Sequence, residues 1–242
     1  MLRTEERIAF ENIGEVLFRK SKRCKRLSIH IKPIKGVEVI FPPSYPIRKA
    51  IAFVESRKEW IQQSLHKMKA YERDYTLFDE NTLFKTRSFK LNIQKVQRAD
   101  VRLHLDKGIL NVYYPAHIPV QTPAIQEAIR FGIVEALRRE AKRYLPDRLN
   151  YFAHLHNFNY QQLFIKNLKS RWGSCSSTNN INLNLHLMRL PDHLIDYVLL
   201  HELCHTVEKN HASSFWNLLD KFTNGRAKLL AQEMKQYRTT IY

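Results

Sequence analysis

Short segments in which apolar and polar residues alternate are frequent in the first half of the chain. They occur at residues 27–31, 37–41, 101–105 and 109–114. Strict alternation is typical of a half-buried strand, because successive side chains point to opposite faces of a sheet. Lys35-Gly36 and Lys107-Gly108 separate the members of each pair, and both dipeptides are turn signals. We therefore expect a strand–turn–strand unit twice, with a further hairpin between them at residues 78–96.

Each predicted pair of strands is followed by proline and then by a helical pattern. Apolar residues recur at helical spacing within residues 47–71, at Ile51, Val54, Trp60, Ile61 and Leu65. They recur again within residues 122–144, at Ile125, Ile129, Ile133, Ala136 and Leu137. Such spacings place the side chains on one buried face of a helix. The succession of strand, turn, strand, proline and helix indicates a diverged internal repeat, although hairpins before helices are also common in unrelated segments.

The C-terminal half returns to strands and then to shorter helices. Alternation at residues 181–187 predicts a strand, and a second strand is expected at residues 164–168. A helix opens at Pro191-Asp192 and carries apolar residues through Leu203 to Val207. Another helix is expected to begin near Ser213. These patterns predict an α+β protein with a β-rich region at residues 1–120 and a second domain at residues 121–242.

The composition is that of a globular protein with a basic surface. The 242 residues are 44% hydrophobic and carry a formal net charge of +17, with a pI near 9.9. No apolar run is long enough to span a bilayer, no signal peptide is visible, and three cysteines do not make a disulfide framework. These features argue against membrane and disulfide-rich secreted classes, and we expect a cytoplasmic location. The densest basic run, residues 19–26, fits either a solvated strand edge or a nucleic-acid patch.

The clearest chemical motif is HELCH at residues 201–205. On a helix, His201 and His205 lie on one face about one turn apart. Two imidazoles at this spacing can share one zinc ion, and Glu202 then lies beside the metal as a general base. Both histidines fall on a different stripe from the apolar residues of the helix, which can bury one side and offer the other to a metal. The simpler interpretation is a helix with two solvated or capping histidines.

His211 is the nearest candidate for a third ligand. If the helix continued, His211 would rotate off the metal face, so the chain must turn back, and Lys209-Asn210 suits a helix end. The alternatives are three carboxylates: Glu208, Asp220 and Glu233. The first lies about 10 Å along the helix axis from His201, and the other two lie in lysine-rich helical sequence that favours exposed ion pairs. We predict one zinc ion held by His201, His205 and His211, with a fourth position left for water, as in catalytic sites.

The strands predicted before the metal helix suit a peptide substrate. An extended peptide can add as a strand to an exposed sheet edge, which lays its scissile carbonyl over the metal. Glu202 would take a proton from water and then pass it to the leaving amine. Arg171 and His186 are candidates for a second donor to the developing oxyanion. Their simpler interpretations are a structural ion pair and an ordinary polar strand residue.

Together these residues resemble the YgjP-like metallopeptidase family, relatives of the SprT-like zincins. The shared features are a basic N-terminal β segment, the sequence SRWGSCS at residues 170–176, HELxH, and Asn210-His211 followed by Phe215-Trp216. The resemblance covers about residues 15–225. It implies a zincin-like C-terminal metallopeptidase domain, with the HExxH helix beside a small antiparallel sheet. It also implies His201, His205 and His211 as zinc ligands and Glu202 as the base.

Three functions fit these observations. The first is a zinc metallopeptidase that cleaves protein or peptide substrates. The second is a protease acting on DNA- or RNA-bound proteins, which the net charge and the DNA-linked SprT-like relatives suggest, although no helix-turn-helix, zinc finger or RNP motif is visible. The third is a non-catalytic zinc-bearing scaffold. Glu202 argues against the scaffold, because a purely structural site has no need of that carboxylate.

Overall fold

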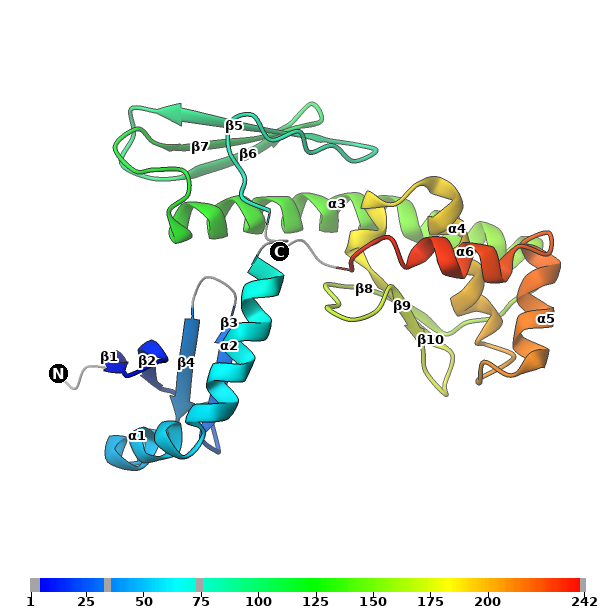
Figure 1. Ribbon diagram of the computed structural model, residues 1–242. Helices are drawn as coiled ribbons and strands as arrows, with labels where there is room; N and C mark the ends of the chain where they lie inside the picture. The colour runs from blue at the N-terminus through cyan, green and yellow to red at the C-terminus, as the bar shows by residue number, and fades with distance from the viewer. Residues whose placement is uncertain (1–4, 33–35, 73–75, 240–242) are drawn as a thin grey trace. The chain divides into compact units, whose positions relative to one another are not determined.

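The computed structural model describes residues 5–32, 36–72 and 76–239 (Figure 1). The chain divides into two units, the first ending at Thr76 and the second beginning at Leu77. This division differs from the boundary predicted near residue 120, because the strands before residue 120 share a core with the long helix that follows it. Across the described residues, no helix combines the length and hydropathy that a bilayer crossing requires.

Four strands and two helices form the first unit. The strands are β1 (Glu5–Phe10), β2 (Gly14–Lys20), β3 (Ser28–Lys32) and β4 (Gly36–Phe41), in the sheet order β1-β2-β4-β3. β4 pairs in parallel with β2 and antiparallel with β3, so β3 is an outer strand. Of the turn predicted at Lys35-Gly36, Lys35 lies outside the described residues, whereas Gly36 has a φ of 70°, which suits glycine.

The single helix predicted at residues 47–71 is two helices, α1 (Ile47–Ser56) and α2 (Lys58–Glu72). Arg57 breaks it, with a φ of −114° and a ψ of 14°. Val54 and Ile61 are buried as predicted, in a core that includes Phe18, Val39 and Phe41. Trp60 is the exception, because its side chain is 50% exposed.

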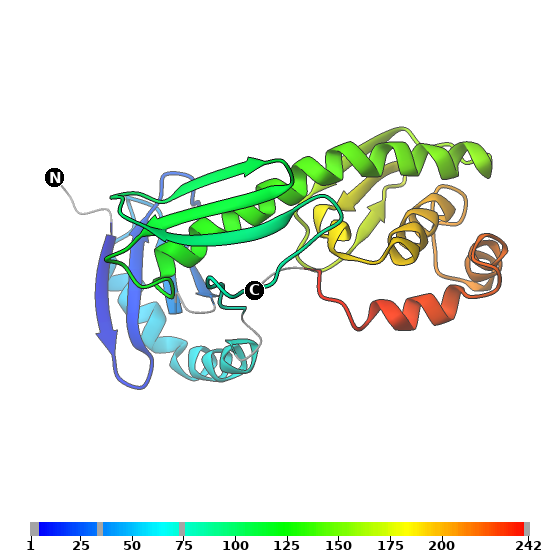
Figure 2. The ribbon, with the colours of Figure 1, turned by 90° about the horizontal axis from the view of Figure 1, so that it is seen from above.

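The second unit is built on one long helix, α3 (Pro123–Leu155). Pro123 opens the helix, where its missing N–H costs no hydrogen bond. The buried positions recur every three or four residues: Ile125, Ile129, Ile133, Ala136, Leu137, Ala141, Leu145 and Leu149. This stripe continues past residue 144, where the predicted helix ends, and the helix accommodates Pro146. Figures 1 and 2 show one sheet packed near the first half of α3 and another near its second half.

The first of these sheets has the strand order β5-β7-β6. Its strands are β5 (Lys90–Val96), β6 (Arg102–Asp106) and β7 (Ile109–Pro115). The hairpin predicted at residues 78–96 is reduced to one antiparallel bridge between Lys85 and Lys90, because β5 instead pairs in parallel with β7. Leu91, Ile93 and Val112 are buried in the core shared with α3.

The second sheet has the strand order β8-β10-β9. Its strands are β8 (Gln162–Lys166), β9 (Gly173–Cys175) and β10 (Asn180–Asn184). The sheet is mixed rather than antiparallel as predicted, because β8 and β10 run parallel. The strand predicted to residue 187 stops at Asn184, whose side chain accepts a hydrogen bond from the backbone nitrogen of His186 at 3.2 Å and opens the 3₁₀ helix η1 (Leu185–Arg189). The chain then forms α4 (Asp192–Cys204), α5 (Ser213–Phe222) and α6 (Ala227–Met234).

The three sheets share one topology. In β2-β4-β3, β5-β7-β6 and β8-β10-β9 alike, the first strand in sequence pairs in parallel with the third, and the second pairs antiparallel with the third. The strand order agrees with the predicted internal repeat and occurs a third time beside the metal motif. Val39, Val112 and Leu183 are each the fourth residue of the third strand, and they pair with Ile29, Leu103 and Gly173 of the second strands, which we therefore treat as equivalent positions.

Candidate metal centre

Three histidines present their Nε2 atoms to one point. The Nε2 atom of His205 lies 3.2 Å from that of His201 and 3.2 Å from that of His211, and the third side of the triangle is 3.1 Å. Hydrogen bonds cannot satisfy all three contacts, because each neutral Nε2 atom is either a donor or an acceptor, so at least two of the three atoms play the same role. Tetrahedral zinc with Zn–N bonds of 2.0–2.1 Å separates its nitrogen ligands by about 3.3–3.4 Å. The triangle therefore fits one zinc-sized cation.

The chain reversal after α4 brings His211 back to the other two histidines. The sequence predicted the end of the helix near Lys209-Asn210, but α4 ends at Cys204, with His205 as its C-terminal cap. Val207, which was assigned to the buried face, is 62% exposed because it lies beyond the helix. The new helix predicted near Ser213 begins there.

A backbone hydrogen bond orients His205. Its Nδ1 atom donates to the carbonyl oxygen of Glu208 at 2.9 Å, so Nε2 carries the free lone pair. The Glu208 carboxylate accepts a hydrogen bond from Ser214 at 2.9 Å, which fixes the reversal to the start of α5. By contrast, Nδ1 of His201 is buried and has no hydrogen-bond partner among the described residues.

Phe215 supports all three imidazole rings. Its ring centroid lies 4.9 Å from that of His201, 4.4 Å from that of His205 and 4.8 Å from that of His211. Phe215 is fully buried, so it gives the rings a fixed apolar wall. Burial, with the neighbouring histidines, lowers the pKa of His201 to about 3, and burial also lowers the pKa of His205. Both are therefore neutral at pH 7, the form in which imidazole binds a metal.

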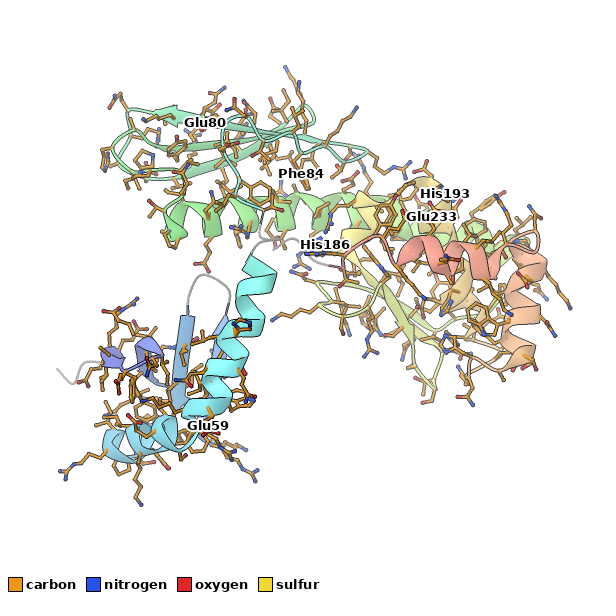
Figure 3. The ribbon with its side chains drawn as sticks, in the orientation of Figure 1. Glu59, Glu80, Phe84, His186, His193 and Glu233 are labelled. Atoms are coloured by element: carbon orange, nitrogen blue, oxygen red, sulfur yellow. The ribbon has the colours of Figure 1, made fainter. Side chains whose placement is uncertain are left out.

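The carboxylates considered as alternative third ligands have other partners. Asp220 accepts a hydrogen bond from the backbone nitrogen of Ala227 at 2.9 Å. Glu233 lies 2.8 Å from Nε2 of His193, and Figure 3 shows this pair at the start of α4. Among the described residues, the one cluster of ligand atoms close enough to share an ion contains three histidines and no carboxylate.

Glu202 lies beside the histidines and against β9. Its side chain is buried, and burial raises the pKa of its carboxyl group to about 8, while Arg171 acts in the opposite direction. Its Oε2 atom has no hydrogen-bond partner in the described structure. A β-carbon built on Gly173 would lie 2.5 Å from Oε1 of Glu202, closer than atoms can approach. Only glycine at position 173 leaves room for this carboxylate.

Two adjoining cavities open on the candidate site. One, of about 390 Å³, is lined by the three histidines together with Ser170, Arg171, Gly173, Ser174, Cys175, Glu202 and Lys209. The other, of about 380 Å³, shares Arg171, Glu202 and His211 and adds an apolar wall: Trp172, Val198, Trp216, Ala231 and Met234. The first can admit a polar backbone and the second an apolar side chain.

The two predicted oxyanion donors lie in different surroundings. Arg171 lines both cavities. His186 lines neither, since it is buried in η1, with Nε2 at 3.2 Å from Asn167 and Nδ1 at 3.2 Å from an Arg189 nitrogen (Figure 3). The geometry therefore favours Arg171.

Tyr197 was missed by the sequence analysis. It lines the apolar cavity one helical turn before His201, and their ring centroids are 5.9 Å apart. The signal that could have found it is this spacing of four residues, which places Tyr197 on the metal face of α4.

The model of the YgjP-like family, described as a metallopeptidase domain, matches residues 25–237. No curated protein matches the chain. Among solved structures, the metallopeptidase zymogen of Pyrococcus abyssi abylysin is 26% identical, with 38% of this chain and 92% of that chain covered and a TM-score of 0.34. The zymogen of Methanocaldococcus jannaschii jannalysin is 27% identical, with 38% and 93% covered and a TM-score of 0.34.

Proposed function

Since the chain belongs to the YgjP-like metallopeptidase family, we propose that it hydrolyses peptide bonds with one zinc ion held by His201, His205 and His211. The observation that carries this proposal is the triangle of Nε2 atoms, 3.1–3.2 Å apart, beside the buried carboxylate of Glu202. Three neutral nitrogen ligands are a preferred set for zinc, and three protein ligands are typical of catalytic rather than structural zinc sites.

Zinc, when bound, supplies Lewis acidity, which lowers the pKa of a water molecule to about 7 and polarises a substrate carbonyl. Glu202 is proposed as the group that moves the proton. Its Oε2 atom has no competing hydrogen bond. The charge of a bound cation would favour the carboxylate form of this group, which can accept a proton from water. The apolar surroundings that raise its pKa then stabilise the protonated form until the proton passes to the leaving amine.

Arg171 and Tyr197 are proposed to assist at the substrate carbonyl. Arg171 lines both cavities, and its guanidinium carries several N–H donors, so it can donate to a developing oxyanion. Burial, with the charge of Glu202, raises the pKa of Tyr197 to about 12, which keeps its hydroxyl protonated and therefore a donor. Removing either donor would lower turnover more than it lowers zinc affinity.

The substrate is proposed to lie as an extended chain along β9. β9 pairs with β10 and forms one end of the strand order β8-β10-β9. Its residues Gly173 to Cys175 also line the metal cavity. A peptide added to this edge would place its carbonyls along the cavity, with an apolar side chain in the cavity of Trp172 and Trp216.

The test combines metal analysis with proteolysis of a denatured protein mixture. We expect one zinc ion per chain in the parent protein and in Glu202→Gln, and peptide hydrolysis by the parent alone. Retained hydrolysis in Glu202→Gln would exclude the proposed base, and a metal-free parent would exclude the zinc centre. Parallel assays with single- and double-stranded DNA examine the nucleic-acid-linked alternative, which requires DNA-stimulated cleavage that weakens steeply with salt.

A further inference from the structure

An apolar groove lies beside the outer strand of the first unit. One wall is residues 27–29 at the start of β3, and the other is Phe53, Arg57 and Trp60 of the two helices. The groove encloses about 250 Å³. Trp60 is 50% exposed. Of the large hydrophobic residues that are exposed in the described part of the chain, Trp60 is the one that belongs to the first unit. A half-exposed tryptophan in a groove is a typical anchor for a partner.

This groove lies at the same place beside the sheet β2-β4-β3 as the metal cavity does beside the sheet β8-β10-β9. Ile29 and Gly173 are equivalent by register, so residues 27–29 correspond to residues 171–173, which line the cavities at the metal centre. In both sheets, the facing wall includes residues of a helix that follows the third strand: α1 and α2 after β4, and α4 after β10. The groove differs in chemistry, because aromatic rings and one guanidinium replace the metal-binding histidines.

We propose that the groove of Phe53, Arg57 and Trp60 is a non-catalytic docking site for extended acidic peptides that carry one large apolar side chain. That the occupant is a peptide rests on the proposed peptidase function, since the equivalent cleft takes an extended chain. Within the described residues, β4 is the strand partner of β3, and the sheet order leaves the opposite edge of β3 without a strand. An incoming peptide can therefore pair with β3 while its apolar side chain covers Trp60.

The charged residue that lines the groove is Arg57, which favours an acidic peptide. The guanidinium of Arg57 lies 5.7 Å from the Phe53 ring centroid, and no ion pair joins it to a carboxylate in the described part of the chain. Lys25 and Arg26 are exposed immediately before Leu27. A carboxylate next to the apolar anchor would pair with Arg57, and further carboxylates would be attracted by the basic residues before β3.

The test measures fluorescence anisotropy of a labelled peptide with a central phenylalanine flanked by glutamates. The protein is the full chain carrying Glu202→Gln, which leaves the peptide intact. We expect Trp60→Ala to raise the Kd at least about tenfold. Arg57→Glu should remove the preference for the glutamate peptide over its lysine counterpart. Leu83→Ala is the matched control, because Leu83 is a fully exposed apolar residue outside the groove, and it should leave the Kd unchanged.

A peptide with methylated backbone nitrogens tests pairing with β3, and it should lose most of the affinity. An unchanged Kd in Trp60→Ala would overturn the proposal. A second result would also overturn it: the parent binds a single-stranded oligonucleotide but not the peptide, and Trp60→Ala abolishes the oligonucleotide binding. Aromatic rings beside basic residues also suit stacked bases. Hydrolysis by the parent is measured separately. Docking without hydrolysis would contradict only the proposed function, and hydrolysis without docking only the groove.

Discussion

Gly173 lies so close to Glu202 that a β-carbon on the strand would fall 2.5 Å from Oε1 of the carboxylate. The strand and the helix are thus matched at one point, where the smallest residue faces the proposed base. The contact is with the end of the Glu202 side chain rather than with backbone, so a larger residue at position 173 would displace the carboxylate first.

We therefore expect Gly173→Ala to fold and bind zinc but to lose at least about tenfold in kcat, because a small misplacement of a catalytic group is costly. Steady-state kinetics and zinc analysis check this. Gly225→Ala is the control, since Gly225 has open space but a φ of 72°. Gly225→Ala should lower the melting temperature with little effect on kcat, the opposite pattern to Gly173→Ala. Equal kcat in Gly173→Ala and the parent would show that Glu202 does not need its present position.

The third ligand can be identified by zinc competition against a chelator. His211→Ala should weaken zinc binding by about a hundredfold or more, because it removes one of three protein ligands. Glu233→Ala should leave the affinity unchanged, since Glu233 pairs with His193 and lies outside the histidine cluster. The reverse result would assign the site to a distant carboxylate.

Glu202 should make the metal-free protein less stable in alkali. Burial raises its folded-state pKa to about 8, so between the unfolded value of 4.5 and pH 8 the folded chain holds a proton that the unfolded chain releases. That stabilising contribution is present below about pH 4.5 and is lost as the pH rises to 8. The free energy of unfolding of Glu202→Gln minus that of the parent should therefore increase by about 3 kcal/mol between pH 5 and pH 9. Denaturant unfolding of chelated protein measures it, and a difference that does not vary with pH would contradict the burial of this group.

His186 should sensitise the second unit to acid. Burial, with the charge of Arg189, lowers its folded-state pKa to about 3, so below pH 6.5 the unfolded chain binds a proton that the folded chain does not. Stability is then lost as the pH falls from 6.5 towards 3. Between pH 7 and pH 4, the free energy of unfolding should fall by up to about 3 kcal/mol less in His186→Gln than in the parent. Denaturant unfolding at a series of pH values measures this difference, and parallel curves for His186→Gln and the parent would contradict the burial of the imidazole.

Glu140 on α3 provides a test of packing away from the metal centre. It is 4% exposed, and neither carboxylate oxygen has a hydrogen-bond partner among the described residues. Replacing an unpaired buried carboxylate by an apolar residue of similar length removes a desolvation cost. Glu140→Met should raise the free energy of unfolding by about 1–2 kcal/mol in denaturant titrations. A loss of stability would mean that this carboxylate has a partner in solution.

Much of the secondary structure was predictable from periodicity, whereas strand pairing was not. Alternation identified Ile181 and Leu183 as buried, because the pattern records which face a side chain occupies. It does not record the neighbouring strand, so the parallel pairing of β8 with β10 was missed. Leu185 and Leu187 keep the same alternation in a 3₁₀ helix, because Asn184 bonds to the backbone of His186 and ends the strand.

The cluster of three histidines was predictable because the spacing of its members is local. His201 and His205 needed only helical geometry, and His211 needed only a chain reversal. The roles inferred for Gly173 and Tyr197 required contacts or cavity walls that the sequence does not display. Gly173 is separated from Glu202 by a strand, η1 and most of α4, so no pattern in the sequence joins the two residues.

Leu103 and Gly173 occupy equivalent positions in their sheets. The helix residue that faces the large one is small, and the helix residue that faces the small one is large. Opposite Leu103 the helix carries Gly132, where a β-carbon would lie 3.3 Å from the leucine side chain. Opposite Gly173 the helix carries Glu202. In one copy the strand fills the gap, and in the other the helix fills it. The two copies therefore place the larger side chain on opposite sides of the sheet–helix contact, and glycine on the strand is what leaves room for a carboxylate on the helix.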